Sequence, residues 1–292
     1  MPYLLALASA LLYGAADFTG GLASRRAGML PVVVLSQLSG LVLLVMLLPF
    51  LPPASPSRAD LLWGVSAGFT GGVGVALLYR ALAIGRMAVV APITAVCAVA
   101  IPVVVSVGLG VRPGPLAALG MLLGLGAIVL VSQQSAPETG PVDQAAAERL
   151  PTARLPPGAG IALVSGVAIG LFFLSLAETR PEAGMWPILV ARATSVTIFG
   201  LTAALGQHSL RMPGTLALTL LCGVVDMAAN ALYLMAARTG PLSVVVTLAS
   251  LYPASTVLLA RVVLGERLNA RQVAGVGCAL AAIVLIVSGG RP

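Results

Sequence analysis

The chain has 292 residues, of which 59% are hydrophobic and only 9% are charged, and its mean hydropathy is +1.06. Soluble domains carry about 25% charged residues, so this composition excludes an ordinary water-soluble fold and indicates a chain embedded in a lipid bilayer. The net charge of +7 comes from Arg residues that lie singly or in pairs between apolar runs, a pattern that favours membrane-surface loops over a nucleic-acid-binding face.

Apolar runs long enough to cross a membrane follow one another from the first residues onward. A crossing helix needs about 20 apolar residues. The first run lacks the basic start of a signal peptide, so we expect it to be retained. Pro92, Pro102 and Pro253 fall inside the fourth and ninth runs, where we expect kinks. The ten predicted spans are Tyr3–Leu22, Leu30–Phe50, Leu61–Leu82, Met87–Leu109, Leu116–Ser132, Ala159–Ala177, Trp186–Leu205, Leu216–Ala237, Leu242–Val263 and Val273–Val287.

The two halves of the chain resemble each other. Ala27–Pro31 recurs as Ala183–Pro187, displaced by 156 residues, and Gly85–Val131 aligns without a gap to Gly240–Ile286, displaced by 155. We therefore predict a first repeat over residues 1–133, a polar linker over 134–157 and a second repeat over 158–292.

An odd number of spans in each repeat has a consequence for topology. Five crossings bring the second repeat into the membrane from the opposite face, so the two repeats are inverted with respect to each other. The predicted fold is therefore all-α, a polytopic membrane protein with ten transmembrane helices in two inverted five-helix repeats. This arrangement is common in secondary transporters, where it gives two alternative packings open to either side.

Several short segments resemble the EamA-type family of the drug/metabolite transporter superfamily. The resemblance covers nearly the whole chain outside the linker and implies a membrane transporter that exports amino acids, other metabolites or drugs. The segments that carry it are Tyr13–Phe18, Tyr79–Gly85, Tyr252–Ala254, Leu264–Leu268 with Gly275, and Ala282–Leu285.

The two repeats differ at one position of this pattern. The first repeat has Gly110-Val111-Arg112 where the family often has Gly-Glu, and the matching Glu266 occurs only in the second repeat. We interpret Glu266 as a structural residue at a helix end, near Arg267 and Arg271.

Three charged residues fall well inside predicted spans: Asp17, Arg192 and Asp226. A charge at the centre of a membrane helix costs about 2.5–3.5 kcal/mol on insertion scales, so such residues are candidates for function. A rise of about 1.5 Å per residue places Asp17 and Arg192 at different depths. We expect that these two do not pair directly, whereas Asp226, at an intermediate depth, could reach Arg192.

These charges suggest a binding site between the repeats. Our hypothesis is that they line a central cavity in which Arg192 holds an anionic group and an Asp holds a cationic group or a proton. Asn230 follows Asp226 by four residues and shares its helix face. A structural ion pair or a snorkelling charge is the alternative interpretation. The predicted substrate-binding residues are Tyr13, Asp17, Gln37, Tyr79, Arg192, Asp226 and Asn230.

Other motifs do not indicate catalysis. Gly64–Gly68 matches a nucleophile-elbow pattern around Ser66, but it lies within a predicted helix, and His208 is expected at the opposite membrane face. Cys97, Cys222 and Cys278 lie in apolar runs without metal-ligand spacing and are interpreted as packing residues. We predict no metal, no cofactor and no nucleic-acid partner.

The sequence therefore predicts a secondary transporter rather than an enzyme. It would move a small metabolite or drug-like solute by alternating access, as an exporter in the bacterial inner membrane, with the bilayer as surroundings and protons as the candidate coupling ion. An oligomer is not required. The alternatives are a non-transporting membrane scaffold or sensor, and an intramembrane enzyme that acts on lipid.

Overall fold

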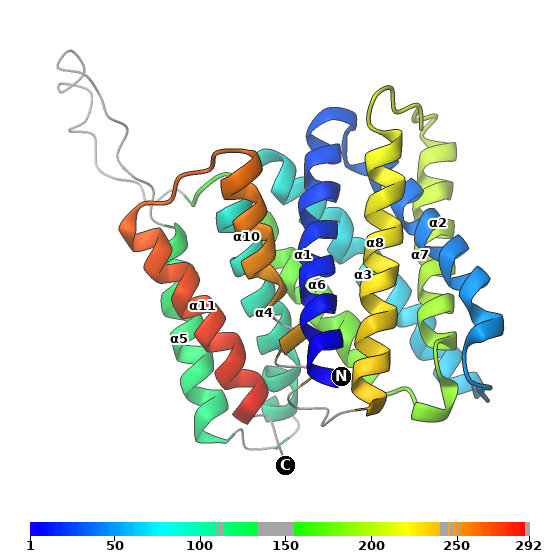
Figure 1. Cartoon of the computed structure of the whole chain (residues 1–292), viewed down its shortest axis with the longest axis horizontal. Helices are drawn as coiled ribbons and strands as arrows, with labels where there is room; N and C mark the ends of the chain where they lie inside the picture. Colours follow the sequence, from blue (N-terminus) through cyan, green and yellow to red (C-terminus); the bar gives the residue numbers. More distant parts are fainter. Residues whose placement is uncertain are drawn as a thin grey trace.

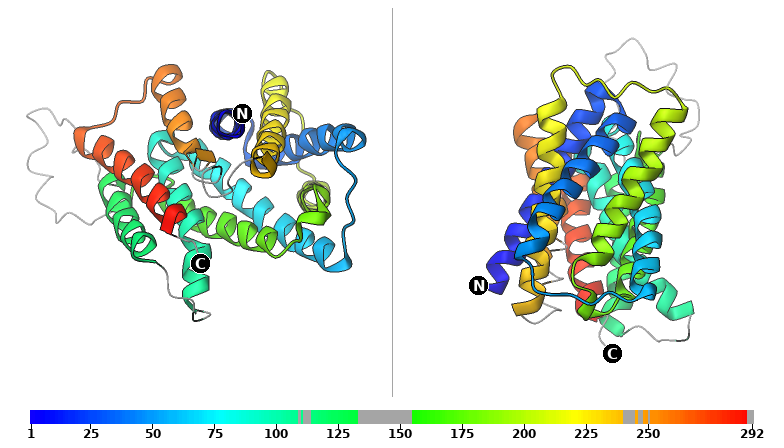
Figure 2. Two further views of the ribbon diagram at one scale, coloured as in Figure 1. Left: turned by 60° about the horizontal axis from the view of Figure 1, so that its bottom comes forward. Right: turned by 90° about the vertical axis from the view of Figure 1, so that its right-hand side faces the viewer.

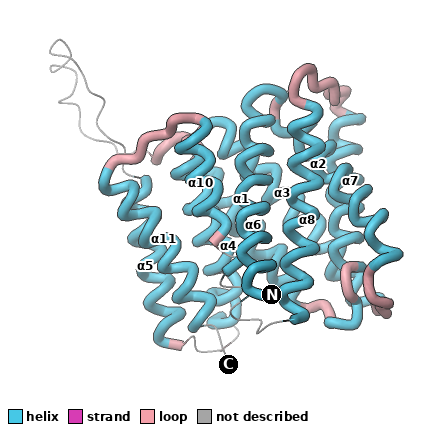
Figure 3. Tube along the Cα trace, in the orientation of Figure 1, coloured by secondary structure: helices cyan, strands magenta, loops and turns pink. Residues whose placement is uncertain are grey.

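The computed structural model describes residues 1–108, 110, 114–132, 155–239, 245, 248–249 and 251–289. Across this part of the chain every regular element is helical, with ten α-helices, two short 3₁₀ turns and no strand (Figure 3). The first half contains α1 (Pro2–Ala27), α2 (Met29–Leu47), η1 (Leu48–Phe50), α3 (Arg58–Ile84), α4 (Met87–Gly108) and α5 (Pro115–Ser132). The second half contains α6 (Ala159–Ala177), η3 (Pro181–Ala183), α7 (Trp186–Leu205), α8 (Leu216–Thr239), α10 (Tyr252–Val263) and α11 (Ala270–Gly289).

The helices are those of an integral membrane protein. Six described helical segments are long and apolar enough to cross a membrane, and four shorter apolar segments accompany them in α4, α5, α10 and α11. Figure 1 shows the helices running up and down one bundle, with the start of α1 and the end of α11 at the same end. The six long segments are Pro2–Ala27, Met29–Phe50, Arg58–Ile84, Ala159–Ala177, Trp186–Leu205 and Leu216–Ala236.

The ninth predicted span is interrupted in the structure. Leu242–Val263 was expected to be one helix with a kink at Pro253; the described residues 245, 248 and 249 are helical, but a turn follows at Leu251 and α10 begins at Tyr252. Pro253 therefore lies in the first turn of α10, where its missing N–H and fixed φ are tolerated. Pro92 and Pro102 do lie inside α4. Residues 134–154 of the predicted linker, and 242–244, 246–247 and 250 of the ninth span, lie outside the described residues.

Helices from the two halves of the chain are interleaved. α1 packs against α8, and α3 packs against α6; similarly, α10 lies against α1 and α4 lies against α6. α2 contacts both α7 and α8. α5 and α11 form a closely packed pair at one edge of the bundle, and α2 and α7 lie at the opposite edge (Figures 1 and 2). The centre is therefore built from both halves.

Two glycines permit the closest helix crossings. A Cβ atom at Gly14 of α1 would lie 1.8 Å from Ser255 Oγ of α10, and one at Gly223 of α8 would lie 1.9 Å from the Ser36 carbonyl oxygen of α2. No larger side chain fits at such separations, so these glycines set how closely the helices approach.

The start of α3 is fixed by an acidic residue. Ser57 and Asp60 form a capping box, in which the Ser57 side chain accepts from the Asp60 N–H and Asp60 accepts from the Ser57 N–H at 2.7 Å. Asp60 also accepts from the Arg180 backbone and guanidinium, both at 2.9 Å. The guanidinium hydrogen bond to Asp60, together with the negative charge of that carboxylate, raises the pKa of Arg180. The contact ties the connection between α6 and α7 to α3.

Candidate functional site

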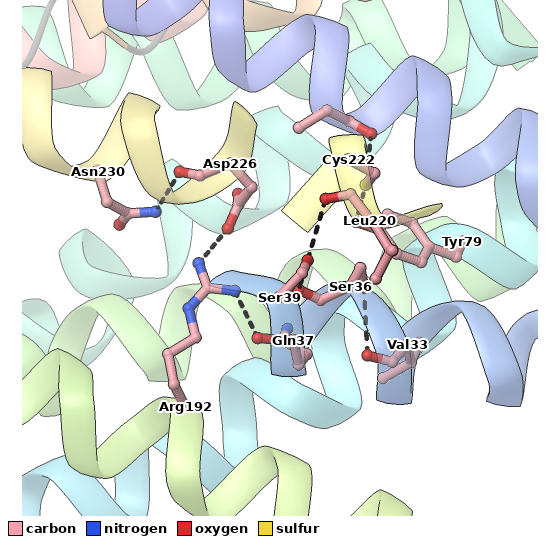
Figure 4. Close-up of polar contacts among 11 residues, drawn as sticks. Val33, Ser36, Gln37, Ser39, Tyr79, Arg192, Leu220, Cys222, Asp226 and Asn230 are labelled. Atoms are coloured by element: carbon pink, nitrogen blue, oxygen red, sulfur yellow. Dashed lines mark hydrogen bonds and ion pairs between the residues drawn. The ribbon is translucent and has the colours of Figure 1, made fainter. Parts of the chain in front are cut away.

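A partly buried ion pair lies between α2, α7 and α8 (Figure 4). Arg192 of α7 donates through Nη2 to the Asp226 carboxylate of α8 and through Nη1 to Gln37 Oε1 of α2. The Arg192 and Asp226 side chains are 12% and 25% exposed, and Gln37 is 6% exposed. The prediction that Asp226 could reach Arg192 is confirmed, and Gln37 is the second partner of the guanidinium.

The helices around this ion pair are held together by small residues and one hydroxyl. A Cβ atom at Gly40 would lie 3.0 Å from the Gly223 carbonyl oxygen and 3.5 Å from Arg192 Nη1. Ser39 Oγ of α2 donates to the Leu220 carbonyl of α8 at 3.0 Å. The close approach of α2 to α8 therefore lets Gln37 and Asp226 bind the same guanidinium, because both partners lie within reach of one planar group.

Tyr79 lies beside this cluster and contacts a thiol. Its ring packs on α1, where a Cβ at Gly20 would lie 2.4 Å from Tyr79 Cζ. The Tyr79 hydroxyl lies 3.1 Å from Cys222 Sγ, and the thiol donates to the Ala16 carbonyl at 3.3 Å. Because Cys222 precedes Asp226 by one helical turn on α8, the two polar groups share a face of that helix. Tyr79 is thus close to the ion pair but bonded to Cys222.

Asn230 and Tyr13 have partners of their own. Asn230 Nδ2 donates to the backbone carbonyl of Asp226 at 2.8 Å, so it lies on the same face of α8 as predicted, with its amide nitrogen bound to its own helix. The Tyr13 ring of α1 meets the Tyr252 ring of α10 edge-on, with centroids 6.3 Å apart. Among the described contacts, neither side chain hydrogen-bonds to the Arg192 guanidinium or to the Asp226 carboxylate.

Asp17 has no counter-ion in the cluster. It is half-buried and, within the described part of the chain, it makes no hydrogen bond or ion pair, while it interacts electrostatically with Asp226. Arg192 is bonded to Asp226 and Gln37 instead, in agreement with the expectation that Asp17 and Arg192 do not pair. When both acids are ionised, Arg192 supplies one positive charge against two carboxylates, so one negative charge is left without a counter-ion in the cluster.

Three residues of this region were not among the predicted site residues: Ser39, Cys222 and Tyr252. Cys222 was interpreted as a packing residue, although its position one turn before Asp226 was a usable signal. Tyr252 belongs to one of the segments that carry the family resemblance, but no role was assigned to it from the sequence. Ser39 had no signal in the sequence, because its role depends on which face of α2 meets α8.

Ser66 of the nucleophile-elbow pattern lies in a helix and faces another serine. Its hydroxyl lies 3.0 Å from the Ser175 hydroxyl, and both serines lie in helices. Among the described residues, no group of three His, Cys, Asp or Glu side chains could hold a metal ion.

Glu266 has partners that the sequence did not indicate. It lies in the connection between α10 and α11, where its carboxylate accepts from the backbone N–H groups of Met87 and Ala88 at 3.1 and 3.0 Å. Its ion-pair partner is Arg25 of α1, at 3.4 Å, rather than its sequence neighbour Arg267. Glu266 thus lies at a helix end, as expected, but the helix whose N–H groups it binds is α4, which is distant in sequence.

Comparison with known proteins decides the family. The sequence profile of the EamA-like transporter family matches residues 1–133 and 156–288. The chain belongs to this family. Membership supports a role as a membrane transporter.

Comparison with solved structures gives information about the fold alone. Among curated proteins none matches the EamA-like chain. A solved crystal structure of a protein superposes with a TM-score of 0.61 at 15% sequence identity, covering 97% of this chain and 95% of that chain. At this identity the likeness shows a shared architecture.

Proposed function

We propose that this EamA-like protein is a secondary transporter that moves a small metabolite or drug-like solute by alternating access. The observation that carries the proposal is the Arg192–Asp226 ion pair with Gln37, half-buried to buried between helices of both halves of the chain. Intramembrane charges are costly and mark substrate or ion pathways. The proposed direction is export, across a bacterial inner membrane.

Similar segments and similar helix packing in the two halves of the chain support the mechanism. The family profile matches two segments, 1–133 and 156–288, close to the two repeats predicted from the sequence. α1 and α6 are equivalent in the two repeats, and so are α3 and α8. A two-fold axis in the membrane plane would therefore relate the packing of α1 on α8 to the packing of α6 on α3, and both contacts are present. We propose that ten spans form two inverted repeats, and that these rock about the central cluster to expose it to either side.

The cluster suggests how a solute binds. Arg192 already has two acceptors, so an anionic group on the solute would compete with Asp226 for the guanidinium. Asp226 and Asp17 would then be available to a cationic group or a proton, because a carboxylate without a counter-ion in this environment is unfavourable. Tyr13, Tyr79 and Asn230 would border the solute.

The test is transport by the purified protein in reconstituted vesicles. A thermal-shift screen of amino acids, sugars, nucleosides and organic cations selects the probe, and uptake of that radiolabelled probe is then measured. We expect Asp226→Asn and Arg192→Ala to abolish uptake, while Thr202→Ala, an exposed residue bonded within its own helix, leaves it unchanged. Unchanged uptake in the first two variants would remove the ion pair from the site. Absence of uptake for every probe would favour a scaffold or sensor.

A further inference from the structure

Charged contacts join distant segments at the end of the bundle where α1 finishes and α4 begins. Glu266 accepts from the first two N–H groups of α4, those of Met87 and Ala88. Arg25, near the end of α1, pairs with the same carboxylate. The Glu266 side chain is 11% exposed and that of Arg25 is 28% exposed. One carboxylate therefore links α1, α4 and the connection between α10 and α11.

The same two residues complement the dipoles of the α3–α4 hairpin. Arg25 donates to the carbonyl oxygens of Leu82 at 3.2 Å and Gly85 at 2.9 Å, where α3 ends. The C-terminus of a helix carries partial negative charge and the N-terminus partial positive charge. The cation thus lies at the end of α3 and the anion at the start of α4, and both satisfy backbone groups that the helices leave unpaired.

The sequence repeat does not duplicate this arrangement. A displacement of 155 residues makes Val111 the equivalent of Glu266, and a displacement of 156 makes Pro181 the equivalent of Arg25. Neither residue can carry a charge. At the other end of the bundle, where α1 and α3 begin, the Arg180–Asp60 ion pair joins the α6–α7 connection to α3, and the buried residues Ala6, Ala236 and Val245 form an apolar cluster. The described contacts at the two ends therefore join different helices: Glu266 and Arg25 hold the start of α4 to α1, whereas Arg180 and Asp60 hold the α6–α7 connection to α3.

We propose that Glu266 and Arg25 form a one-sided latch on the transport path. The latch holds the start of α4 against α1 and the α10–α11 connection, and it breaks each time the path opens at that end. This inference rests on the alternating access proposed above. It assigns Glu266 a conformational role, separate from solute binding by the central cluster.

The latch can be tested without a solute, by cysteine accessibility in nanodiscs, where both membrane faces meet the reagent. Cys97, Cys222 and Cys278 are first replaced by Ala, and a single probe is then introduced as Met87→Cys or as Ala6→Cys. The Met87 side chain is fully buried and its Cε would lie 3.0 Å from a Cβ at Gly21, so it reports separation of α4 from α1. Ala6 is also fully buried and reports the other end. A water-soluble maleimide measures the labelling rate of each probe.

We expect the labelling rate to rise at position 87 and to stay unchanged at position 6. Glu266→Gln should speed labelling at position 87 about tenfold, because charge-assisted hydrogen bonds are lost. Arg25→Gln should give a smaller rise, because Glu266 still binds the start of α4. Arg267→Gln, an exposed neighbour, is the matched control and should leave the rate unchanged, as should every variant at position 6.

Two results would overturn the latch. The first is an unchanged rate at position 87 in Glu266→Gln. The second is an equal rise at positions 87 and 6, which would show general loosening rather than opening at one end. Failure of the transport proposal looks different: position 87 responds to Glu266→Gln, but vesicles that contain the same protein move no solute.

Discussion

Ser9 and Ser165 make equivalent hydrogen bonds in the two halves of the bundle. Ser9 Oγ of α1 donates to the Ala229 carbonyl of α8, and Ser165 Oγ of α6 donates to the Gly74 carbonyl of α3, each at 2.8 Å. The donors are 156 residues apart and the acceptors 155 apart, which are the displacements of the sequence repeat. Both serines are fully buried. Such a pair of contacts supports a two-fold relation between the halves.

We expect Ser9→Ala and Ser165→Ala to destabilise the protein by similar amounts, each about 1 kcal/mol, since hydrogen bonds between membrane helices contribute in this range. The measurement is the free energy of unfolding in detergent micelles. Thr202→Ala serves as control, because its exposed hydroxyl bonds to Ile198 in its own helix. A large loss for one serine and none for the other would contradict equivalent roles.

Gly223→Ala should weaken the contact of α8 with α2. The added methyl group would lie 1.9 Å from the Ser36 carbonyl oxygen, which is backbone and cannot rotate away. We expect a destabilisation of about 2 kcal/mol, as for other overpacked sites, and reduced transport because Gln37 and Asp226 move apart. Gly277→Ala of α11 is the matched control, since a Cβ there meets no atom within 4 Å. Equal stability of the two variants would contradict this account of the α2–α8 contact.

The helices could be predicted because charges and turns interrupt the apolar runs. Ala159–Ala177 and Trp186–Leu205 were predicted from the sequence and are the bounds of α6 and α7. The depth of a charged residue in the membrane could also be predicted, because the rise per residue of a helix is fixed. The estimated depths correctly indicated that Asp226 could reach Arg192. The turn at Leu251 was predicted as a kink at Pro253, because Pro suits either a kink or the first turn of a helix.

Other contacts depend on how each helix is rotated about its axis. Tyr79 binds Cys222, and Glu266 binds Arg25, a residue 241 positions away in the sequence. Depth and periodicity do not specify which face of one apolar helix meets another when nearly every face is apolar. The partner of a polar side chain therefore emerged only from the packed structure.

Asp17→Asn tests the carboxylate that has no counter-ion in the cluster. If Asp17 carries the coupling proton, this variant should lose the response of solute uptake to an imposed pH gradient while it still binds the solute, because the Arg192–Asp226 ion pair is intact. Uptake by vesicles with and without a pH gradient measures the response, and thermal shift measures solute binding. Thr19→Val, two residues further along α1, is the control. A variant that still follows the gradient would exclude Asp17 as the coupling group.

The Arg192–Asp226 ion pair should show strong energetic coupling. Arg192→Met leaves a carboxylate without its cation, and Asp226→Leu leaves the guanidinium with Gln37 alone. Removing one partner of a buried ion pair costs about 3–5 kcal/mol, whereas replacing both by apolar residues costs much less. We therefore expect the double variant to be more stable than either single variant, as measured by unfolding of all four proteins.

Transport separates this structural effect from function. All three variants should fail to move solute, including the double variant whose stability is recovered, because the groups that would bind the solute are gone. Arg192→Lys keeps the charge but loses the planar fork that binds Asp226 and Gln37 together, so it should retain more stability than Arg192→Met and still transport poorly. If the losses of stability in the two single variants simply add in the double variant, the residues are not coupled. If the double variant transports normally, the ion pair only stabilises the fold, and the solute binds elsewhere.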